Sequence, residues 1–141
     1  MFCLLASVVA CSCEKDKNCD FDGAYQFEIP ATLSPALDTF QVGDTIHFKA
    51  TDAAHNSVSV DGMVPVGASS WASQLSQDIS ITLDTEGVYV YQCDPHLIMA
   101  MVGVIQVGEA VNMDEIKSAA SSYSSNFLMN NDRLQSYLSQ L

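Results

Sequence analysis

The feature that most constrains the fold is a series of short segments in which apolar and polar residues alternate, between residues 24 and 107. This alternation is typical of strands with one buried face, because successive side chains point to opposite faces of a sheet. The segments lie at 24–29, 44–50, 55–60, 78–83, 88–93 and 101–107. Turn residues such as Gly43-Asp44 and Asp61-Gly62 separate them. These short strands, with turn signals between them, predict a mainly β domain over residues 24–109, an antiparallel sandwich or barrel.

A helical periodicity begins after Gly108. Asn112 is a candidate N-cap, and Glu115 three residues later fits a capping box. Apolar residues recur at helical spacing in segments 112–123 and 130–141, namely Ile116, Ala119, Ala120 and Tyr123, and then Leu134, Tyr137, Leu138 and Leu141. Residues 110–141 are therefore predicted to form an extension of two short helices. Because such helices are unstable alone in water, we expect both to pack on the β domain.

The charge balance limits the classes of partner. Acidic side chains number 17 against five Lys and Arg, which gives a net charge of −12. Such a surface repels nucleic acid and anionic lipid and favours basic partners. With 48% hydrophobic and 16% charged residues in 141, the chain has the composition of one globular domain.

The N-terminal segment indicates export. Residues 1–10 are uncharged and mainly apolar, which predicts a signal peptide. The sequence VVAC at residues 8–11 resembles the bacterial lipoprotein motif, so Cys11 is the predicted lipidation site and residues 11–23 form a lipidated polar tether. The apolar run is too short for a transmembrane helix. We therefore expect a lipoprotein of the bacterial periplasm or cell envelope, attached to the membrane only through its lipid. Whether Cys13 and Cys19 pair is left open.

One loop segment gathers residues that suit a metal. Cys93, His96 and Met101 have the spacing C-x2-H-x4-M. Thiolate, imidazole and a weakly bound thioether are ligands of the copper site that contains two His, one Cys and a distant axial Met. Pro95 favours the tight turn that lets Cys93 and His96 face one ion. The spacing thus supplies three of the four ligands, and the fourth has to be another histidine.

Two histidines remain for that fourth position. His47 lies between Ile46 and Phe48, which are expected to point inward, so His47 is expected on the outer face of its strand. His55 begins the next strand segment, where a side chain can reach the rim of the sandwich. From the residue pattern alone, His55 is either a ligand or an ordinary histidine at a strand edge.

Two longer segments resemble pseudoazurins, which are small blue copper proteins of the cupredoxin family. The segment 54–71, AHNSVSVDGMVPVGASSW, is similar to the pseudoazurin segment that carries the first ligand. The segment 87–108, GVYVYQCDPHLIMAMVGVIQVG, is similar to the one that carries the others. The strand VGDTIHF at 42–48 and the two C-terminal helices are further shared features. The resemblance covers about residues 36–141.

The resemblance implies a cupredoxin Greek-key sandwich that binds one type 1 copper ion, Cu(I) or Cu(II). It implies four copper ligands, which are His55, Cys93, His96 and Met101. It also implies that the Asn56 backbone N–H donates to the Cys93 sulfur and that the Asn56 side chain ties the ligand loop. Because Pro95 has no N–H, the sulfur would receive that one hydrogen bond.

Two departures from pseudoazurins bear on function. Position 94 carries Asp where these proteins usually have a small neutral residue, and a carboxylate there would favour Cu(II) over Cu(I). Asp94 could also be a loop residue bonded to Asn56. Pseudoazurins surround their docking face with lysines, whereas this chain has few, so a more basic, cytochrome-like partner is expected. The segment Leu97, Ile98 and Met99 is the predicted apolar docking patch, with buried loop packing as the alternative.

The function implied is single-electron transfer between exported redox proteins by a monomer, without enzymatic activity. A copper carrier or storage module is the alternative, since it would use the same ligands. A copper nitrite reductase would need a second His-rich site, for which only His47 is left. A zinc site is compatible with Cys and His but not with a thioether ligand.

Overall fold

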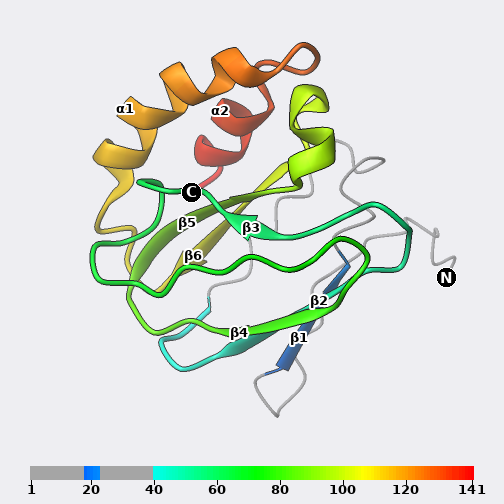
Figure 1. Ribbon diagram of the computed structural model, residues 1–141. Coiled ribbons are helices and arrows are strands. Elements are labelled where there is room, and N and C mark those ends of the chain that lie inside the picture. The colour runs from blue at the N-terminus through cyan, green and yellow to red at the C-terminus, as the bar shows by residue number, and fades with distance from the viewer. Residues whose placement is uncertain (1–17, 23–39) are drawn as a thin grey trace, which may run out of the picture.

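The computed structural model describes residues 18–22 and 40–141, which form a sandwich of two β-sheets with helices over one side (Figure 1). One sheet has the strand order β1-β2-β4, and the other has the order β3-β5-β6. The strands are β1 (Asn18–Asp22), β2 (Thr45–Lys49), β3 (Val58–Ser59), β4 (Ile79–Thr82), β5 (Gly87–Gln92) and β6 (Val102–Val107). The predicted mainly β sandwich is confirmed.

Strand direction departs from the prediction at one edge. Strands β2–β4, β3–β5 and β5–β6 pair antiparallel, but β1 pairs parallel with β2. A parallel bridge also joins Phe40 to Val107. The prediction of an antiparallel sandwich is therefore wrong at the β1 edge and at the Phe40–Val107 bridge. Alternation along a strand reports which face is buried, and it carries no information on the direction of the neighbouring strand.

Strand β1 lies inside the segment 11–23 for which a polar tether is predicted, so the structure differs from that prediction at residues 18–22. Its sequence NCDFD alternates polar residues with Cys19 and Phe21, and as an edge strand it pairs on one side only. The predicted signal peptide at 1–10, the tether cysteines Cys11 and Cys13, and the predicted strand at 24–29 lie outside the described residues.

The sheet containing β5 and β6 is buried on both faces. Tyr89 and Tyr91 point from β5 toward the β2–β4 sheet and join an aromatic cluster with Phe48. Val88 and Val90 point to the opposite face, toward the helices. All these side chains are buried, so β5 reads as a continuous apolar run. Alternate residues along it pack into two different cores, one on each face of the sheet.

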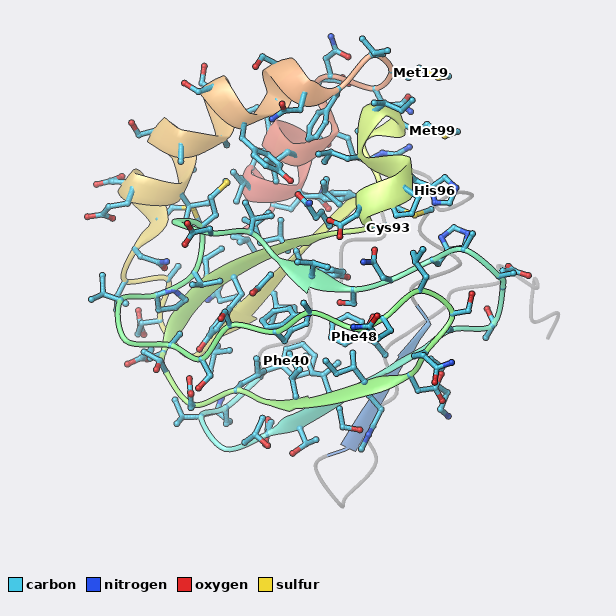
Figure 2. The ribbon with its side chains drawn as sticks, viewed as in Figure 1. Phe40, Phe48, Cys93, His96, Met99 and Met129 are labelled. Carbon is cyan, nitrogen blue, oxygen red and sulfur yellow. The ribbon has the colours of Figure 1, made fainter. Side chains whose placement is uncertain are left out.

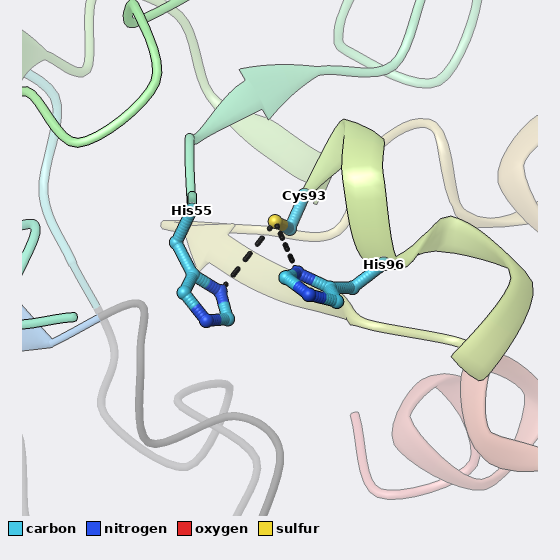
Figure 3. Close-up of side chains that lie close together, drawn as sticks. All are labelled: His55, Cys93 and His96. Atoms are coloured by element: carbon cyan, nitrogen blue, oxygen red, sulfur yellow. Dashed lines mark hydrogen bonds between the residues drawn. The ribbon is translucent and has the colours of Figure 1, made fainter. Parts of the chain in front are cut away.

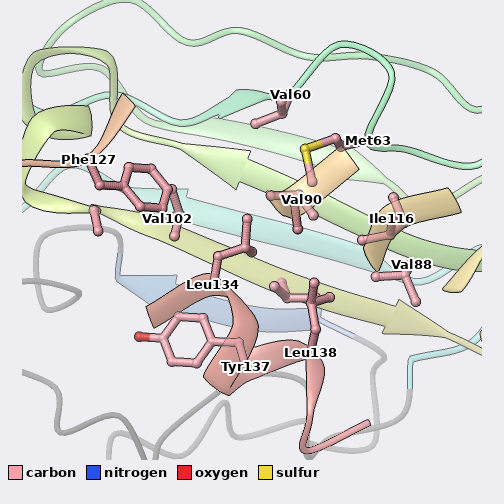
Figure 4. Packing of buried hydrophobic residues seen from close by; sticks show 13 residues of the cluster. Val60, Met63, Val88, Val90, Val102, Ile116, Phe127, Leu134, Tyr137 and Leu138 are labelled. Atoms are coloured by element: carbon pink, nitrogen blue, oxygen red, sulfur yellow. The ribbon is translucent and has the colours of Figure 1, made fainter. Parts of the chain in front are cut away.

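Two C-terminal helices cover the second face, as predicted, and Figure 4 shows their apolar side chains against β5 and β6. They are α1 (Met113–Tyr123) and α2 (Arg133–Leu138), with a short 3₁₀ turn η4 (Ser124–Asn126) after the first. The predicted stripes supply the buried contacts of both helices, from Ile116, Ala120, Leu134, Tyr137 and Leu138. No helix in the described part of the chain is long and apolar enough to cross a membrane.

Asn112 precedes α1 but does not cap it with its side chain, so the predicted capping box is wrong. Its Oδ1 accepts a hydrogen bond from Val88 N at 2.7 Å, and its Nδ2 donates to Val88 O at 2.9 Å. The side chain thus pairs with the β5 backbone as another strand would. This interaction fixes the start of α1 on the sheet.

Candidate metal centre

The loop between β5 and β6 is short and closed by its own backbone. Cys93 follows β5, the 3₁₀ helix η3 (Asp94–Met99) comes next, and Ala100 turns the chain with a φ of 55°. Cys93 N donates to Met101 O at 3.0 Å, and Met101 N donates to His96 O at 3.3 Å. These bonds bring Cys93, His96 and Met101 together at one end of the sheet.

His55 reaches the same place from a separate loop ahead of β3. The preceding residue, Ala54, has a φ of 65°, and its N–H donates to Ser76 Oγ at 2.8 Å. The carbonyl of His55 accepts from Ser76 N at 2.8 Å. A left-handed residue and two bonds to Ser76 therefore hold the backbone on which the His55 ring is mounted.

Three side chains converge at this end of the sandwich (Figure 3). The Cys93 sulfur lies 3.6 Å from His55 Nδ1 and 3.4 Å from His96 Nδ1. One ligand atom from each of these residues lies within 4.8 Å of the other two. The imidazole rings stack at a centroid distance of 4.3 Å. The arrangement brings together a thiol and two imidazoles that one metal ion could bind.

The remaining ligand candidate, Met101, is 1% exposed and lies in the core just ahead of β6. Its backbone bond to Cys93 makes it a direct neighbour of the thiol segment. Cys93 is also buried, whereas both imidazoles are partly exposed. The sulfur side of the group is thus enclosed in protein, and the imidazole side faces solvent.

Burial and local charge shape the acid–base behaviour of the group. Burial raises the pKa of the Cys93 thiol, and the Asp94 carboxylate adds to this, while the backbone N–H groups of Asn56 and His96 oppose it. Burial and the neighbouring His55 lower the pKa of His96. His96 is therefore held in the neutral form that binds metals. The His96 backbone N–H also donates to the Cys93 carbonyl at 3.2 Å.

Hydrogen bonds connect the two ligand segments beside the group. Asp94 N donates to Asn56 Oδ1 at 2.8 Å, and Asn56 Nδ2 donates to Asp94 Oδ2 at 3.0 Å. Gln92 Nε2 donates to the other carboxylate oxygen at 2.6 Å. The Asp94 side chain therefore ties the loop to Asn56, which is one of the two interpretations of Asp94 given from the sequence. Gln92 was missed, because a polar residue at a strand end gives no signal by itself.

Other residues singled out from the sequence have separate positions. His47 lies on β2, where its Nδ1 contacts Ser80 Oγ at 2.6 Å, while Ile46 and Phe48 are buried on the opposite face. Pro95 lies in the first turn of η3. His47 is thus on the outer face of its strand, as expected, and away from the group formed by His55, Cys93 and His96.

The three predicted docking residues differ in exposure. Leu97 packs against the helical core cluster, whereas Ile98 is 52% exposed and Met99 is partly buried. Two apolar residues that sequence reasoning missed lie alongside, Leu128 at 77% and Met129 at 56% exposure. Their N–H groups donate to Ile98 O at 2.8 and 3.2 Å, and Figure 2 shows Met129 next to Met99 beyond His96.

Comparison with known proteins agrees with this geometry. A family model described as copper binding proteins, plastocyanin/azurin family, matches residues 32–108. The chain is 37% identical over 98 residues to a pseudoazurin of Paracoccus pantotrophus, a match that covers 69% of this chain and 63% of that protein. It is 38% identical over 89 residues to a pseudoazurin of Methylorubrum extorquens, covering 63% of this chain and 59% of that one. In these matches the chain spans about six tenths of the relatives' length.

Solved structures extend the comparison to the fold. The native pseudoazurin of Hyphomicrobium denitrificans superposes with a TM-score of 0.61 and 31% identity, over 73% of this chain and 79% of that one. The pseudoazurin of Methylobacterium extorquens gives 0.62 and 32%, over 73% and 80%. The fold is therefore that of the cupredoxins. With a family match over more than half of its length, the chain belongs to the plastocyanin/azurin family of copper-binding proteins.

Proposed function

We propose that the protein is a blue copper electron carrier that binds one copper ion through His55, Cys93, His96 and Met101. The observation that carries the proposal is the convergence of one thiol and two imidazoles within 4.8 Å, on segments far apart in sequence. Copper, when bound, supplies a one-electron couple between Cu(I) and Cu(II). The relatives called pseudoazurins support the same assignment.

The donor set fits copper better than the other metals considered. A thiolate, two imidazoles and the thioether of Met101, whose backbone carbonyl accepts from Cys93 N, are soft or borderline ligands, which suit both oxidation states of copper. Zinc accepts Cys and His but is seldom bound by a thioether, and the buried Met101 offers one. Hard cations such as Mg²⁺ and Ca²⁺ require oxygen ligands, which this group lacks.

The rigidity of the site favours an electron carrier over a copper carrier or storage module. Backbone bonds within 93–101 fix one ligand segment, and Ser76 fixes the other. A delivery protein has to release its metal, which is easier from exposed and mobile ligands. Here the thiol is 4% exposed and Met101 is 1% exposed. A fixed set of ligands instead lets the metal change oxidation state with little rearrangement.

The roles of the protein's own residues follow from their environments. The Cys93 thiol must lose its proton to bind a metal, and burial raises its pKa, so metal binding has to displace that proton. His96 is neutral near pH 7 because burial and His55 lower its pKa. Asn56 and Asp94 hold the two ligand segments together. No covalent step on a substrate is needed, and we propose no enzymatic activity.

Docking is proposed to use the apolar surface next to His96. This surface, called here the apolar rim, consists of Ile98, Met99, Leu128 and Met129. It includes two of the three residues predicted from sequence and leaves out Leu97, which packs inward. The net charge of −12 favours a basic redox partner, such as a basic cytochrome, and a monomeric carrier suits brief docking.

Export to the bacterial periplasm or cell envelope, with a lipid on Cys11, completes the proposal. It rests on the apolar segment 1–10 and the VVAC sequence alone. Expression of the full chain in a bacterium tests it by fractionation and mass spectrometry. Cys11→Ala should move the protein from the membrane fraction to the soluble exported fraction. Wild-type protein that is already soluble, with Cys11 unmodified, would refute the anchor.

The metal assignment is tested by adding Cu(II) to the purified protein and recording the absorption spectrum. An intense thiolate-to-copper band in the visible, saturating at one equivalent, is expected. Cys93→Ser should remove the band and leave the circular dichroism of the β-sandwich unchanged. Copper binding without such a band, or a band that persists in Cys93→Ser, would overturn the ligand assignment.

A further inference from the structure

A chain of hydrogen bonds runs from helix α1 to both ligand segments. The Tyr123 hydroxyl donates to Gln92 Oε1. Gln92 Nε2 then donates to Asp94 Oδ1 at 2.6 Å. The second carboxylate oxygen accepts from Asn56 Nδ2 at 3.0 Å, and Asp94 N returns a bond to Asn56 Oδ1 at 2.8 Å. Four side chains, from α1, β5, η3 and the loop ahead of β3, are thus linked in series.

We propose that Tyr123 and Gln92 are positioning residues of the metal centre, through which helix α1 controls the relative placement of the two ligand segments. Asn56 directly follows His55, and Asp94 directly follows Cys93. Within the residues described, their paired bonds connect two segments that lie 38 positions apart in sequence. Any residue that orients the Asp94 carboxylate therefore acts on both.

The direction of each bond explains why the tyrosine matters. A primary amide offers one accepting oxygen and one donating nitrogen, so its orientation is set by its neighbours. Because the Asp94 carboxylate only accepts hydrogen bonds, the amide nitrogen of Gln92 faces it, and Oε1 is left toward the Tyr123 hydroxyl, which donates to it. A reversed amide would place an oxygen against the carboxylate and repel it. The carboxylate thus sets the orientation of the amide, and the Tyr123 hydroxyl holds the other end of the amide, so that Gln92 stays on Asp94.

The surroundings of Tyr123 keep it in this role. Its ring meets Phe127 edge to face, with centroids 5.6 Å apart and an interplanar angle of 89°. Burial, with a smaller effect from the Asp94 carboxylate, raises the pKa of Tyr123. The hydroxyl therefore keeps its proton at neutral pH and remains a donor. Packing of the ring and protonation of the hydroxyl both keep Tyr123 as the first donor of the hydrogen-bond series.

The first test uses the copper-free protein, so its result does not depend on the proposed function. Tyr123→Phe removes the hydroxyl and keeps the ring packed on Phe127. Amide hydrogen exchange at Asp94 N–H, which donates to Asn56, should become about fivefold faster, the factor expected for the loss of one ordinary hydrogen bond. The matched control is Tyr137→Phe. It removes the hydroxyl of a buried tyrosine on α2 that takes no part in these hydrogen bonds.

A second variant separates positioning from a general loss of stability. Gln92→Met keeps a long side chain but removes both bonds, and it should speed exchange at Asp94 at least as much as Tyr123→Phe. If Tyr123 acts through Gln92, the double variant should match Gln92→Met alone instead of adding to it. Additive effects, or equal exchange at Asp94 in wild type, Tyr123→Phe and Tyr137→Phe, would overturn the proposal.

The copper-loaded protein gives an independent signature. Tyr123→Phe should alter the position or intensity of the thiolate-to-copper band and the reduction potential at constant pH, while Tyr137→Phe should leave both unchanged. A merely structural tyrosine would lower the unfolding temperature without moving either quantity. Band and potential equal to those of wild type in Tyr123→Phe would therefore count against a positioning role.

Discussion

The Tyr91 ring on β5 lies directly over Gly103 on β6, so close that a Cβ atom at position 103 would overlap the ring. The two residues are opposite one another in the antiparallel pair. The ring also contacts Phe48 edge to face at a centroid distance of 5.1 Å. Glycine at 103 is therefore a packing requirement of the aromatic core, and that core supports the strand that leads to Cys93.

Gly103→Ala is expected to destabilise the protein by about 1–3 kcal/mol, the usual cost of adding a methyl group to a filled core. Denaturant unfolding of the copper-free protein measures the change. The matched double variant Tyr91→Leu/Gly103→Ala should lose less than the sum of the two single changes, because the ring that causes the overlap is gone. An additive result would show that the alanine acts through the backbone and not through Tyr91.

His47→Ala is expected to leave the thiolate-to-copper band intact, and His55→Ala is expected to abolish or strongly shift it. The physical reason is position: His47 contacts Ser80 on the outer face of β2, while His55 lies 3.6 Å from the Cys93 sulfur. Absorption spectra of both variants with one equivalent of Cu(II) give the comparison. Loss of the band in His47→Ala would mean that the wrong first histidine has been assigned.

The strands that position the site could largely be predicted from the sequence, because their alternation reports burial directly. Segments 44–50, 88–93 and 101–107 coincide with β2, β5 and β6 within a residue or two. Strand β1 was missed although Cys19 and Phe21 alternate with polar residues, because only five residues follow a charged segment, and its parallel pairing leaves no pattern in the sequence. Asn112 likewise has the composition of a helix cap, and only tertiary contact reveals that its side chain bonds Val88.

The candidate site shows a similar division. The spacing of Cys93, His96 and Met101 is local, so the sequence could indicate it. The role of His55 required the resemblance, because residues far apart in sequence meet only in the fold. Gln92 and Tyr123 gave no signal, since a glutamine at a strand end and a tyrosine on a helix stripe are ordinary in those places. Their importance lies in bonds between elements.

Asp94→Asn is expected to raise the reduction potential by tens of millivolts, because removing a negative charge beside the site disfavours Cu(II). In the wild type the two carboxylate oxygens accept from Asn56 and from Gln92. The asparagine amide has a single oxygen, so it keeps only one of these two bonds. Protein-film voltammetry at two salt concentrations measures the change. A shift that shrinks with salt marks the charge as its cause, whereas a lowered potential would contradict this reading.

Tyr137→Phe is expected to reduce the loss of stability in alkaline solution. Burial raises the pKa of Tyr137, with Arg133 acting weakly in the opposite direction. The unfolded chain therefore releases this proton at a lower pH than the folded protein, which favours unfolding as the pH rises. The contribution is complete below a pH of about 10, the ordinary value for tyrosine, and is lost above it. Thermal unfolding between pH 8 and 11 should show a flatter decline for the variant, and parallel curves would refute this.

Replacement of the apolar rim is expected to slow electron transfer without altering copper binding. Leu128→Ser removes the most exposed of its residues. Stopped-flow reduction by a basic cytochrome should be several-fold slower, with the visible band unchanged. Val66→Ser is the matched control, because Val66 is also an exposed apolar residue, 99% accessible, in a turn remote from the rim in sequence. Equal slowing by both would place docking elsewhere.

The charge of the protein should appear in the salt dependence of the same reaction. With a net charge of −12, long-range attraction favours encounter with a positively charged partner. Exposed charges are screened over about 8 Å at physiological ionic strength, so the rate with a basic cytochrome should fall as salt is added. With an acidic cytochrome the rate should be lower than with the basic one, and it should rise as salt is added. Leu128→Ser should shift the curve for the basic partner downward and keep its slope, because that substitution changes contact and not charge. A rate that increases with salt for the basic partner would mean that short-range contact at the rim, and not net charge, selects the partner.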